Sequence, residues 1–174
     1  MNGKFVIAQL FGILGLITVF ISFQCKRNKV LFLVQMLSNI CCGVSLFILD
    51  GMSGMTSIIF ICIRCFLLAF PEYKWASWRG WVLLLIAVNL ITTIKTWNGI
   101  LSILPFIAVS VMTIVCWSQD SKKIRFFQLF LNSPLWIIYH GFTGAYANIF
   151  TEVVCMISVV IFIKRAGWFK RTAG

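Results

Sequence analysis

The chain has 174 residues, of which 61% are hydrophobic and only 11% are charged. A chain of this composition cannot cover its own surface with polar side chains, which excludes a water-soluble globular protein. The formal net charge of +11 is divided among several short segments and is not gathered on one face, so we expect no nucleic-acid partner.

Apolar blocks separated by short polar segments run through the whole sequence. Most of them approach the roughly 17 to 25 residues that a helix needs to cross the hydrocarbon core of a bilayer. In chain order the blocks are 5–23, 30–49, 55–70, 81–94, 100–117, 126–142 and 147–163. They predict an all-α, polytopic membrane protein with seven transmembrane helices. Block 81–94 is the weak one, because its apolar stretch has only 14 residues.

The distribution of basic residues decides whether block 81–94 crosses. With seven spans and the amino terminus outside, twelve basic residues fall in the cytoplasm, whereas Lys4 and Lys95 fall outside. Without that crossing the later half inverts, which leaves six basic residues inside and eight outside. The rule that cytoplasmic loops are positive therefore favours seven spans with a cytoplasmic carboxyl terminus. The twelve residues are Lys26, Arg27, Lys29, Lys74, Arg79, Lys122, Lys123, Arg125, Lys164, Arg165, Lys170 and Arg171.

The first three blocks and the last three share one rhythm: a span, a basic loop, a span, a tight glycine turn and a span. The basic loops contain CKRNK and QDSKKIR, and the turns contain DGMSG and TGAYA. We therefore divide the chain into a first three-helix repeat at 1–70, a linker with the fourth helix at 71–97, a second repeat at 98–163 and a basic cytoplasmic tail at 164–174. A single span separates the triplets, so they have the same orientation, as in transporters built from parallel repeats.

Shifting the second triplet onto the first by 93 residues aligns polar residues inside the spans. Gln35 matches Gln128, and Asn39 matches Asn132. Amide side chains are costly in hydrocarbon, and Gln128, Asn132 and Trp136 follow at helical spacing. These five residues are predicted to line a solute path between the repeats. Amides that only join neighbouring helices by hydrogen bonds are the alternative that the pattern leaves open.

Two prolines and a glycine are candidates for gating. Pro105 and Pro134 fall within the fifth and sixth blocks, where a proline removes a backbone donor and bends a helix. Gly12 occupies the position in the first repeat that corresponds to Pro105. The same features also suit simple packing.

Three ionisable residues fall inside the blocks, where charge is expensive unless it is paired or hydrated. Arg64 is close enough to the cytoplasmic end of its block for its guanidinium to snorkel to the interface. His140 and Glu152 are near the outer ends of their blocks and form a candidate proton-coupling pair. Solvation at the interface explains both residues without any coupling.

The cysteines and the catalytic motifs give no sign of further chemistry. Cys62 and Cys65 form a CxxC, but a redox or metal site also needs a strand context or a second pair of ligands, so we expect packing residues, no metal and no cofactor. The sequence contains no HExxH and no GxSxG motif, and we expect no enzymatic activity.

Several longer motifs resemble the YgjV-type bacterial inner membrane proteins. They are AQLFGILGLITVFISF in the first block, FILDG at the first turn, SIIFICIR in the third block and NSPLWIIYHGFTGAYANIFTE across the last two. These proteins are similar in plan to the SWEET and SemiSWEET transporters (PQ-loop, MtN3-like). The resemblance implies two three-helix bundles joined by the fourth helix, a solute path between them, alternating access and a place in the bacterial inner membrane.

This sequence departs from the SWEET pattern in two respects. Pro105 and Pro134 occur only in the second repeat, and neither is followed by glutamine. SWEET proteins also carry a sugar-contacting asparagine in the third helix of each repeat. Here block 55–70, the third span of the first repeat, contains no asparagine. Asn148, in the third span of the second repeat, is expected to lie too near the outer surface. A sugar substrate is therefore not implied.

Two functions follow as expectations. The first is a transporter or facilitator of a small, neutral polar solute. The second is a non-transporting membrane receptor or partner protein that uses the same bundle. The lipid bilayer is a partner in both, and the sequence leaves homo-oligomerisation open.

Overall fold

The computed structural model describes residues 3–24, 28–70, 72–118 and 120–165. Those residues form helices, and no strand occurs among them. The predicted all-α class is confirmed. Of the predicted basic tail at 164–174, only Lys164 and Arg165 belong to the described residues. The elements are α1 (Gly3–Gln24), α2 (Asn28–Ile48), α3 (Met52–Ala69), α4 (Lys74–Ser77), α5 (Gly80–Lys95), η1 (Ile100–Ser102), α6 (Ile103–Trp117), α7 (Ser121–Phe127), η2 (Gln128–Asn132), α8 (Ser133–Thr143) and α9 (Tyr146–Arg165).

Helical structure covers each of the apolar blocks that the sequence delineates. The block 100–117 is continued through η1 into α6, and the block 126–142 runs from the end of α7 through η2 into α8. By length and composition, two described segments, Met52–Ala69 and Ile100–Trp117, are long and apolar enough to cross a membrane. Shorter apolar stretches lie in α1, α2, α5 and α9. Seven membrane crossings therefore stay a prediction.

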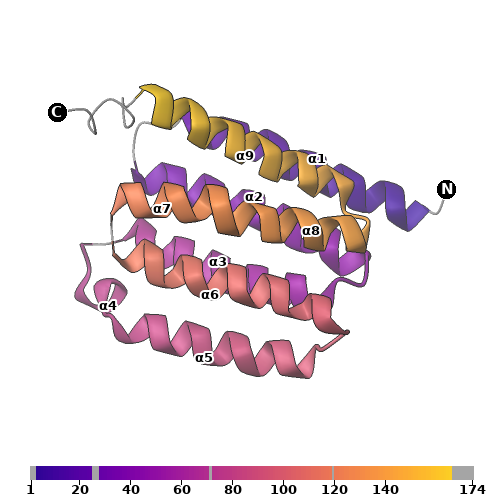
Figure 1. The fold of residues 1–174 in the computed structure, drawn as a ribbon, viewed down its shortest axis with the longest axis horizontal. Coiled ribbons are helices and arrows are strands. Elements are labelled where there is room, and N and C mark those ends of the chain that lie inside the picture. The colour runs from indigo at the N-terminus through magenta and orange to yellow at the C-terminus, as the bar shows by residue number, and fades with distance from the viewer. Residues whose placement is uncertain (1–2, 25–27, 71, 119, 166–174) are drawn as a thin grey trace.

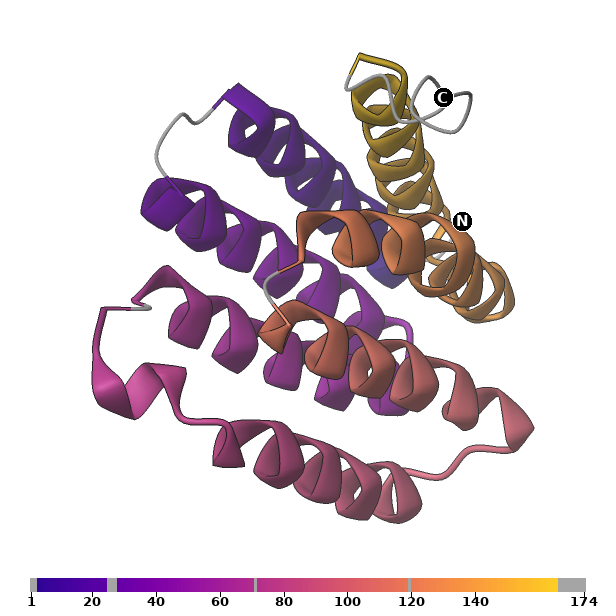
Figure 2. The same ribbon diagram turned by 60° about the vertical axis from the view of Figure 1, so that its left-hand side comes forward.

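The long helices run roughly along one direction in two layers (Figure 1). One layer contains α1, α2 and α3, which pack in that order, and the other contains α9, α8 and α6, with α8 between its two neighbours. The layers contact each other through α1 with α9 and through α3 with α6 (Figure 2). Helix α5 packs along the edge of both layers, against α3 and α6. Helices α1, α2 and α3 of the first triplet correspond to α6, α8 and α9 of the second. Under this correspondence the α1–α9 contact is equivalent to the α6–α3 contact, so the arrangement has an approximate two-fold pattern.

The two ends of the bundle differ in their connections. One end, which we call the turn end, carries the tight turns at Asp50, Asn98 and Gly144. Asp50 and Gly144 have left-handed backbones, with φ of 59° and 72°, and the left-handed Gly144 ends α8 because its N–H donates to His140 O. The other end, which we call the basic end, carries Lys74 and Lys122. In Figure 1, α1 begins at the turn end and α9 finishes at the basic end.

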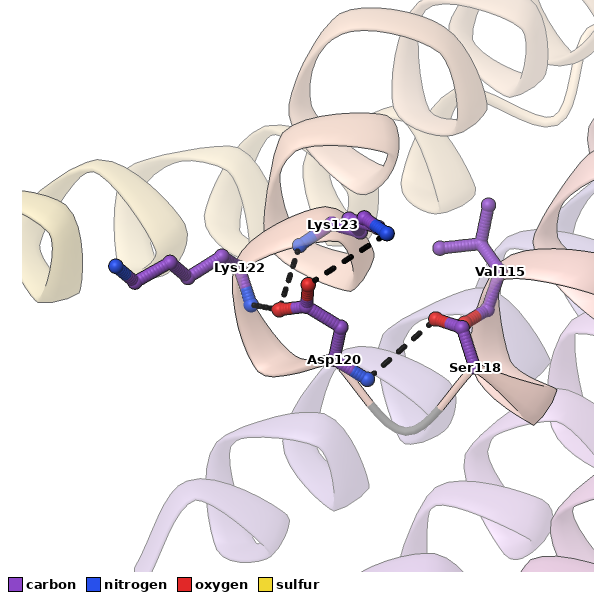
Figure 3. A network of polar contacts seen from close by, with 5 residues as sticks. All are labelled: Val115, Ser118, Asp120, Lys122 and Lys123. Atoms are coloured by element: carbon purple, nitrogen blue, oxygen red, sulfur yellow. Dashed lines mark hydrogen bonds and ion pairs between the residues drawn. The ribbon is translucent and has the colours of Figure 1, made fainter.

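The connection from α6 to α7 shows how a polar residue sets a helix start at the basic end. Asp120 caps α7, since its Oδ1 accepts hydrogen bonds from the backbone N–H groups of Lys122 at 2.9 Å and Lys123 at 3.4 Å (Figure 3). Its own N–H donates to Ser118 Oγ at 3.4 Å, and Ser118 Oγ donates to Val115 O at 2.7 Å. These contacts fix the entry into the segment that carries Gln128 and Asn132.

Candidate functional site

A cavity of about 560 Å³ lies between the two layers. Side chains from α1, α2, α3, α6, α7, η2, α8 and α9 line it. All five residues predicted to form the solute path contribute to its wall: Gln35, Asn39, Gln128, Asn132 and Trp136. The positions matched by the 93-residue shift therefore meet around one space.

The amides at the basic half of this cavity are held by their own helices. Asn39 Nδ2 donates to Gln35 O at 2.8 Å within α2. Asn132 Nδ2 donates to Gln128 Oε1 at 3.3 Å, and Gln128 Nε2 donates to Ser133 Oγ at 3.1 Å. The interpretation of the amides as packing residues requires hydrogen bonds between α2 and α8. In the described part of the chain, these hydrogen bonds stay within one helical segment and do not join the two helices. The amides are oriented on each wall, and the space between the walls stays open.

The backbone that presents Gln128 and Asn132 is π-helical, over Gln128–Asn132. Pro134 follows as one of the first residues of α8. A proline inside a regular helix clashes with the preceding turn and leaves a carbonyl without a donor, and a wider π-turn is one way to accommodate it. Such π-turns often occur at functional sites, because they turn side chains that a regular helix would place elsewhere.

The far half of the cavity, toward the turn end, has a buried polar wall. Trp136, His140 and Asn148 are 2%, 3% and 1% exposed, and the rings of Trp136 and His140 stack with centroids 5.2 Å apart. Four buried polar atoms there have no hydrogen-bond partner among the described residues: His140 Nδ1, both amide atoms of Asn148 and Glu152 Oε2. Burying such atoms unpaired costs about 1–3 kcal/mol each, so a polar solute that reaches them gains that energy. Asn148 is thus a wall residue, and it belongs to the first turn of α9, next to the turn end.

The predicted proton-coupling pair is brought to this same wall. His140 and Glu152 both line the cavity, although no ion pair joins them among the described residues. Interfacial solvation does not explain them, because His140 is buried and Glu152 has a buried oxygen. Their use in proton coupling stays a prediction.

The candidate gating residues occupy different places. Gly12 is buried where α1 passes α9, and a Cβ there would lie 2.6 Å from Ala147 Cβ. Pro105 is the third residue of α6, which directly follows the 3₁₀ turn η1, and Pro134 is the second residue of α8, which directly follows η2. Each proline therefore accompanies an irregular helical turn. Their roles in gating stay predictions.

Hydrogen bonds lie across the turn end of the cavity, and two of the side chains that make them, Tyr139 and Gln9, were not candidates from the sequence. Tyr139 Oη accepts a hydrogen bond from Gly54 N at 2.9 Å and shares one with Ser53 Oγ at 3.0 Å, which joins α8 to α3. Gln9 Nε2 donates to Gly144 O at 2.8 Å, and Ala147 N donates to Gln9 Oε1 at 2.9 Å, which joins α1 to the α8–α9 turn. We call these contacts the turn-end lock. A polar glutamine in the apolar run FVIAQLFG was the one sequence signal for it.

A second, smaller hollow lies beyond the lock. It has a volume of about 120 Å³ and is lined by Asp50, Asn98 and Tyr139, among others. Trp136 lines the large cavity and Tyr139 lines the small one, with their rings edge to face at 6.0 Å. The two aromatic rings and the lock therefore separate the two spaces. At the opposite, basic end, the large cavity reaches the exposed Glu72.

Arg64 also lines the large cavity, which differs from the snorkelling expected of it. The residue is 8% exposed, and its Nη1 donates to Thr113 Oγ1 of α6 at 3.5 Å. Its guanidinium thus stays inside the bundle and does not extend to the basic end.

The sequence matches the family model of the Imp-YgjV bacterial inner membrane proteins over residues 6–168. Neither a curated protein nor a solved structure matches the chain significantly.

Proposed function

The chain belongs to the Imp-YgjV family of bacterial inner membrane proteins, and from this premise we propose that it transports a small polar solute by alternating access. The observation that carries the proposal is the large cavity, which all five predicted path residues line. Toward the turn end, hydrogen bonds and two aromatic rings lie across it. A transporter needs a central polar site that is open to one side at a time.

The surface of the bundle supports multiple crossings of the membrane. Large apolar side chains are exposed on its outer faces, including Leu83 at 76%, Ile94 at 62% and Phe130 at 65%. Exposed apolar area on this scale is unfavourable in water and favourable against lipid. We propose seven crossings, by α1, α2, α3, α5, η1–α6, α7–η2–α8 and α9.

The ends of the bundle support an orientation. Lys74, Lys122 and Lys123 lie at the basic end, whereas Lys4 and Lys95 are the basic residues near the turn end. The positive-inside rule then places the basic end in the cytoplasm and the turn end outside. In this orientation the cavity is inward-facing, and the turn-end lock is the closed outer gate.

The pairing of the helices supports movement of one triplet against the other. The triplets meet through α1 with α9 and α3 with α6, which correspond under exchange of the triplets. A rocking motion about these contacts would break the turn-end lock and close the basic end. The proposed parallel repeats of a three-plus-one-plus-three plan would supply both half-sites.

Uptake into proteoliposomes tests the proposal. Purified protein is tested with radiolabelled sugars, nucleosides, amino acids, organic acids and vitamins, and we expect uptake of some solute above empty liposomes. Asn132→Ala should lower that uptake about three- to tenfold, the loss expected for one hydrogen bond. The matched control is Phe130→Leu, in the same π-helical segment but 65% exposed, which should leave uptake unchanged. Absence of flux for the whole panel would contradict the proposal.

The alternative, a receptor that binds a solute without moving it, uses the same cavity. It is favoured by the closed turn end, because a permanent lock would give a binding pocket without a path. Binding of a solute together with no flux separates this function from transport.

A further inference from the structure

Arg64 is the cationic side chain among the described residues of the large cavity wall. It is 8% exposed, and its neighbours Ile61 and Cys65 on α3 also line the cavity. The guanidinium is a cationic group, so Arg64 brings a positive charge inside the bundle.

The protein supplies little to balance this charge. The acidic residues in the cavity wall are Glu72 and Glu152, and neither forms an ion pair with Arg64 in the described part of the chain. The hydroxyl of Thr113, at 3.5 Å, is a neutral and distant partner, and Arg64 Nε is buried with no hydrogen-bond partner in the part of the chain that the structure describes. A buried charge in a membrane protein is expensive unless it is paired or hydrated.

The chemistry of the group that would pair with it is specific. A guanidinium presents its N–H groups as a planar fork, which matches two oxygens of a carboxylate or phosphate better than any neutral group. The other unpaired atoms of the described wall, on Asn148, His140 and Glu152, lie at the other half of the same cavity and suit the polar remainder of a small molecule.

We infer that Arg64 is the counterion for an oxyanion, a carboxylate or phosphate group, on the solute that occupies this cavity. The inference rests on the proposed function and changes its substrate class from the neutral solute expected from sequence to an anionic one. The solute carries its oxyanion at Arg64 and hydrogen-bonding groups toward Asn132 and Asn148.

Native cysteines give a direct test in the full chain. Cys116 lines the cavity and is partly exposed, whereas Cys41 is partly exposed but does not line it. Two single-cysteine proteins, with the other cysteines replaced by serine, are placed in nanodiscs of phosphatidylcholine and alkylated with neutral N-ethylmaleimide. The probes are matched pairs, glycerol 3-phosphate with glycerol and lactate with 1,2-propanediol. Alkylation is followed by intact-protein mass spectrometry.

We expect an anionic probe to slow alkylation of Cys116 and its neutral twin not to, with Cys41 unaffected by either. Arg64→Gln should raise the concentration for half-protection about ten- to hundredfold, the range for a charge-assisted hydrogen bond. Arg64→Lys keeps the positive charge but loses the planar fork, so its concentration for half-protection should lie between those of the unaltered protein and Arg64→Gln. Thr113→Val retains Arg64 but removes the hydroxyl that accepts its hydrogen bond. We expect the anionic probe still to protect Cys116 in this variant, which gives a test of the inference even if Arg64→Gln does not fold.

Three outcomes would overturn the inference: equal protection by neutral and anionic twins, no protection by any probe, or protection only when phosphatidylglycerol is added to the nanodiscs, which would assign Arg64 to a lipid headgroup. Flux separates the two proposals. If an anion protects Cys116 but is not taken up, the inference about Arg64 stands and transport is contradicted. If a neutral solute is taken up and no anion inhibits its uptake, transport stands and the inference about Arg64 is contradicted.

Discussion

Gly12 shows how much a single missing side chain determines where α1 meets α9. A Cβ at this position would lie 2.6 Å from Ala147 Cβ and 2.8 Å from Asn148 Oδ1. Both distances are shorter than a normal van der Waals contact, so a methyl group would push the first turn of α9 away from α1. Asn148 is also part of the polar wall, so this close contact couples the seam between the layers to the cavity.

Gly12→Ala is therefore predicted to destabilise the protein by about 1–3 kcal/mol, as overpacking of a tight contact usually does. The measurement is thermal unfolding of detergent-purified protein, with Gly141→Ala as the control. A Cβ at Gly141, which is also helical, meets nothing within 4 Å, so that variant should melt like the unaltered protein. Equal melting temperatures for the two variants would contradict a close α1–α9 contact.

At the scale of single residues, sequence reasoning identified five residues of the cavity wall and missed the turn-end lock. Gln35, Asn39, Gln128 and Asn132 were predictable because amides in apolar blocks are costly and recur at one spacing. Tyr139 carried no such signal, because its partner Gly54 is 85 residues away in the chain. Gln9 contacts Gly144 across 135 residues. Pairings over these distances depend on how the layers meet, which a periodic pattern does not encode.

At the scale of elements, the segment from α7 to α8 was predicted as one kinked helix. The structure gives it a π-helical centre, Gln128–Asn132, immediately before Ser133 and Pro134. Pro134 predicted an irregularity in the helix, because proline lacks an N–H. It did not predict which irregularity would form, since a kink, a π-turn and a break all relieve the same clash. The rotation of Gln128 and Asn132 into the cavity depends on that choice.

Helices α3 and α8 meet at the turn-end lock, and Tyr139→Phe is predicted to loosen it. The substitution removes the oxygen that accepts from Gly54 N and pairs with Ser53 Oγ, while it keeps the aromatic ring. With Cys42 of the cavity wall as the single remaining cysteine, a membrane-impermeant thiol reagent applied to right-side-out vesicles should react about three- to tenfold faster, the effect of one lost hydrogen bond.

The control for this prediction is Tyr146→Phe, since Tyr146 is 53% exposed at the same end and its ring packs edge to face on Phe5. It loses a phenol oxygen without touching the lock, so Cys42 should react as in the parent protein. If Tyr139→Phe leaves the rate unchanged as well, the hydrogen bonds of Tyr139 do not limit entry from the turn end.

At the scale of the whole molecule, composition and block spacing predicted the helical class and the approximate position of each helix. The predicted block 81–94, for example, falls within α5, Gly80–Lys95. The order of helices within the layers was not predictable in this way, since every long helix offers apolar side chains to its neighbours. Knowing that α5 packs outside both layers, against α3 and α6, required the tertiary structure.

The crossing of α5 decides the proposed topology, because Lys74 before it and Asn98 after it fall on opposite sides only if α5 spans the membrane. In a background without native cysteines, Asn98→Cys should react with an impermeant maleimide in right-side-out vesicles. Lys74→Cys should react only after permeabilisation. Both positions are exposed, so burial does not confound the comparison. Labelling of both from the same side would mean that α5 lies along the interface. The second triplet would then be inverted against the first, which parallel repeats and a two-fold gate do not allow.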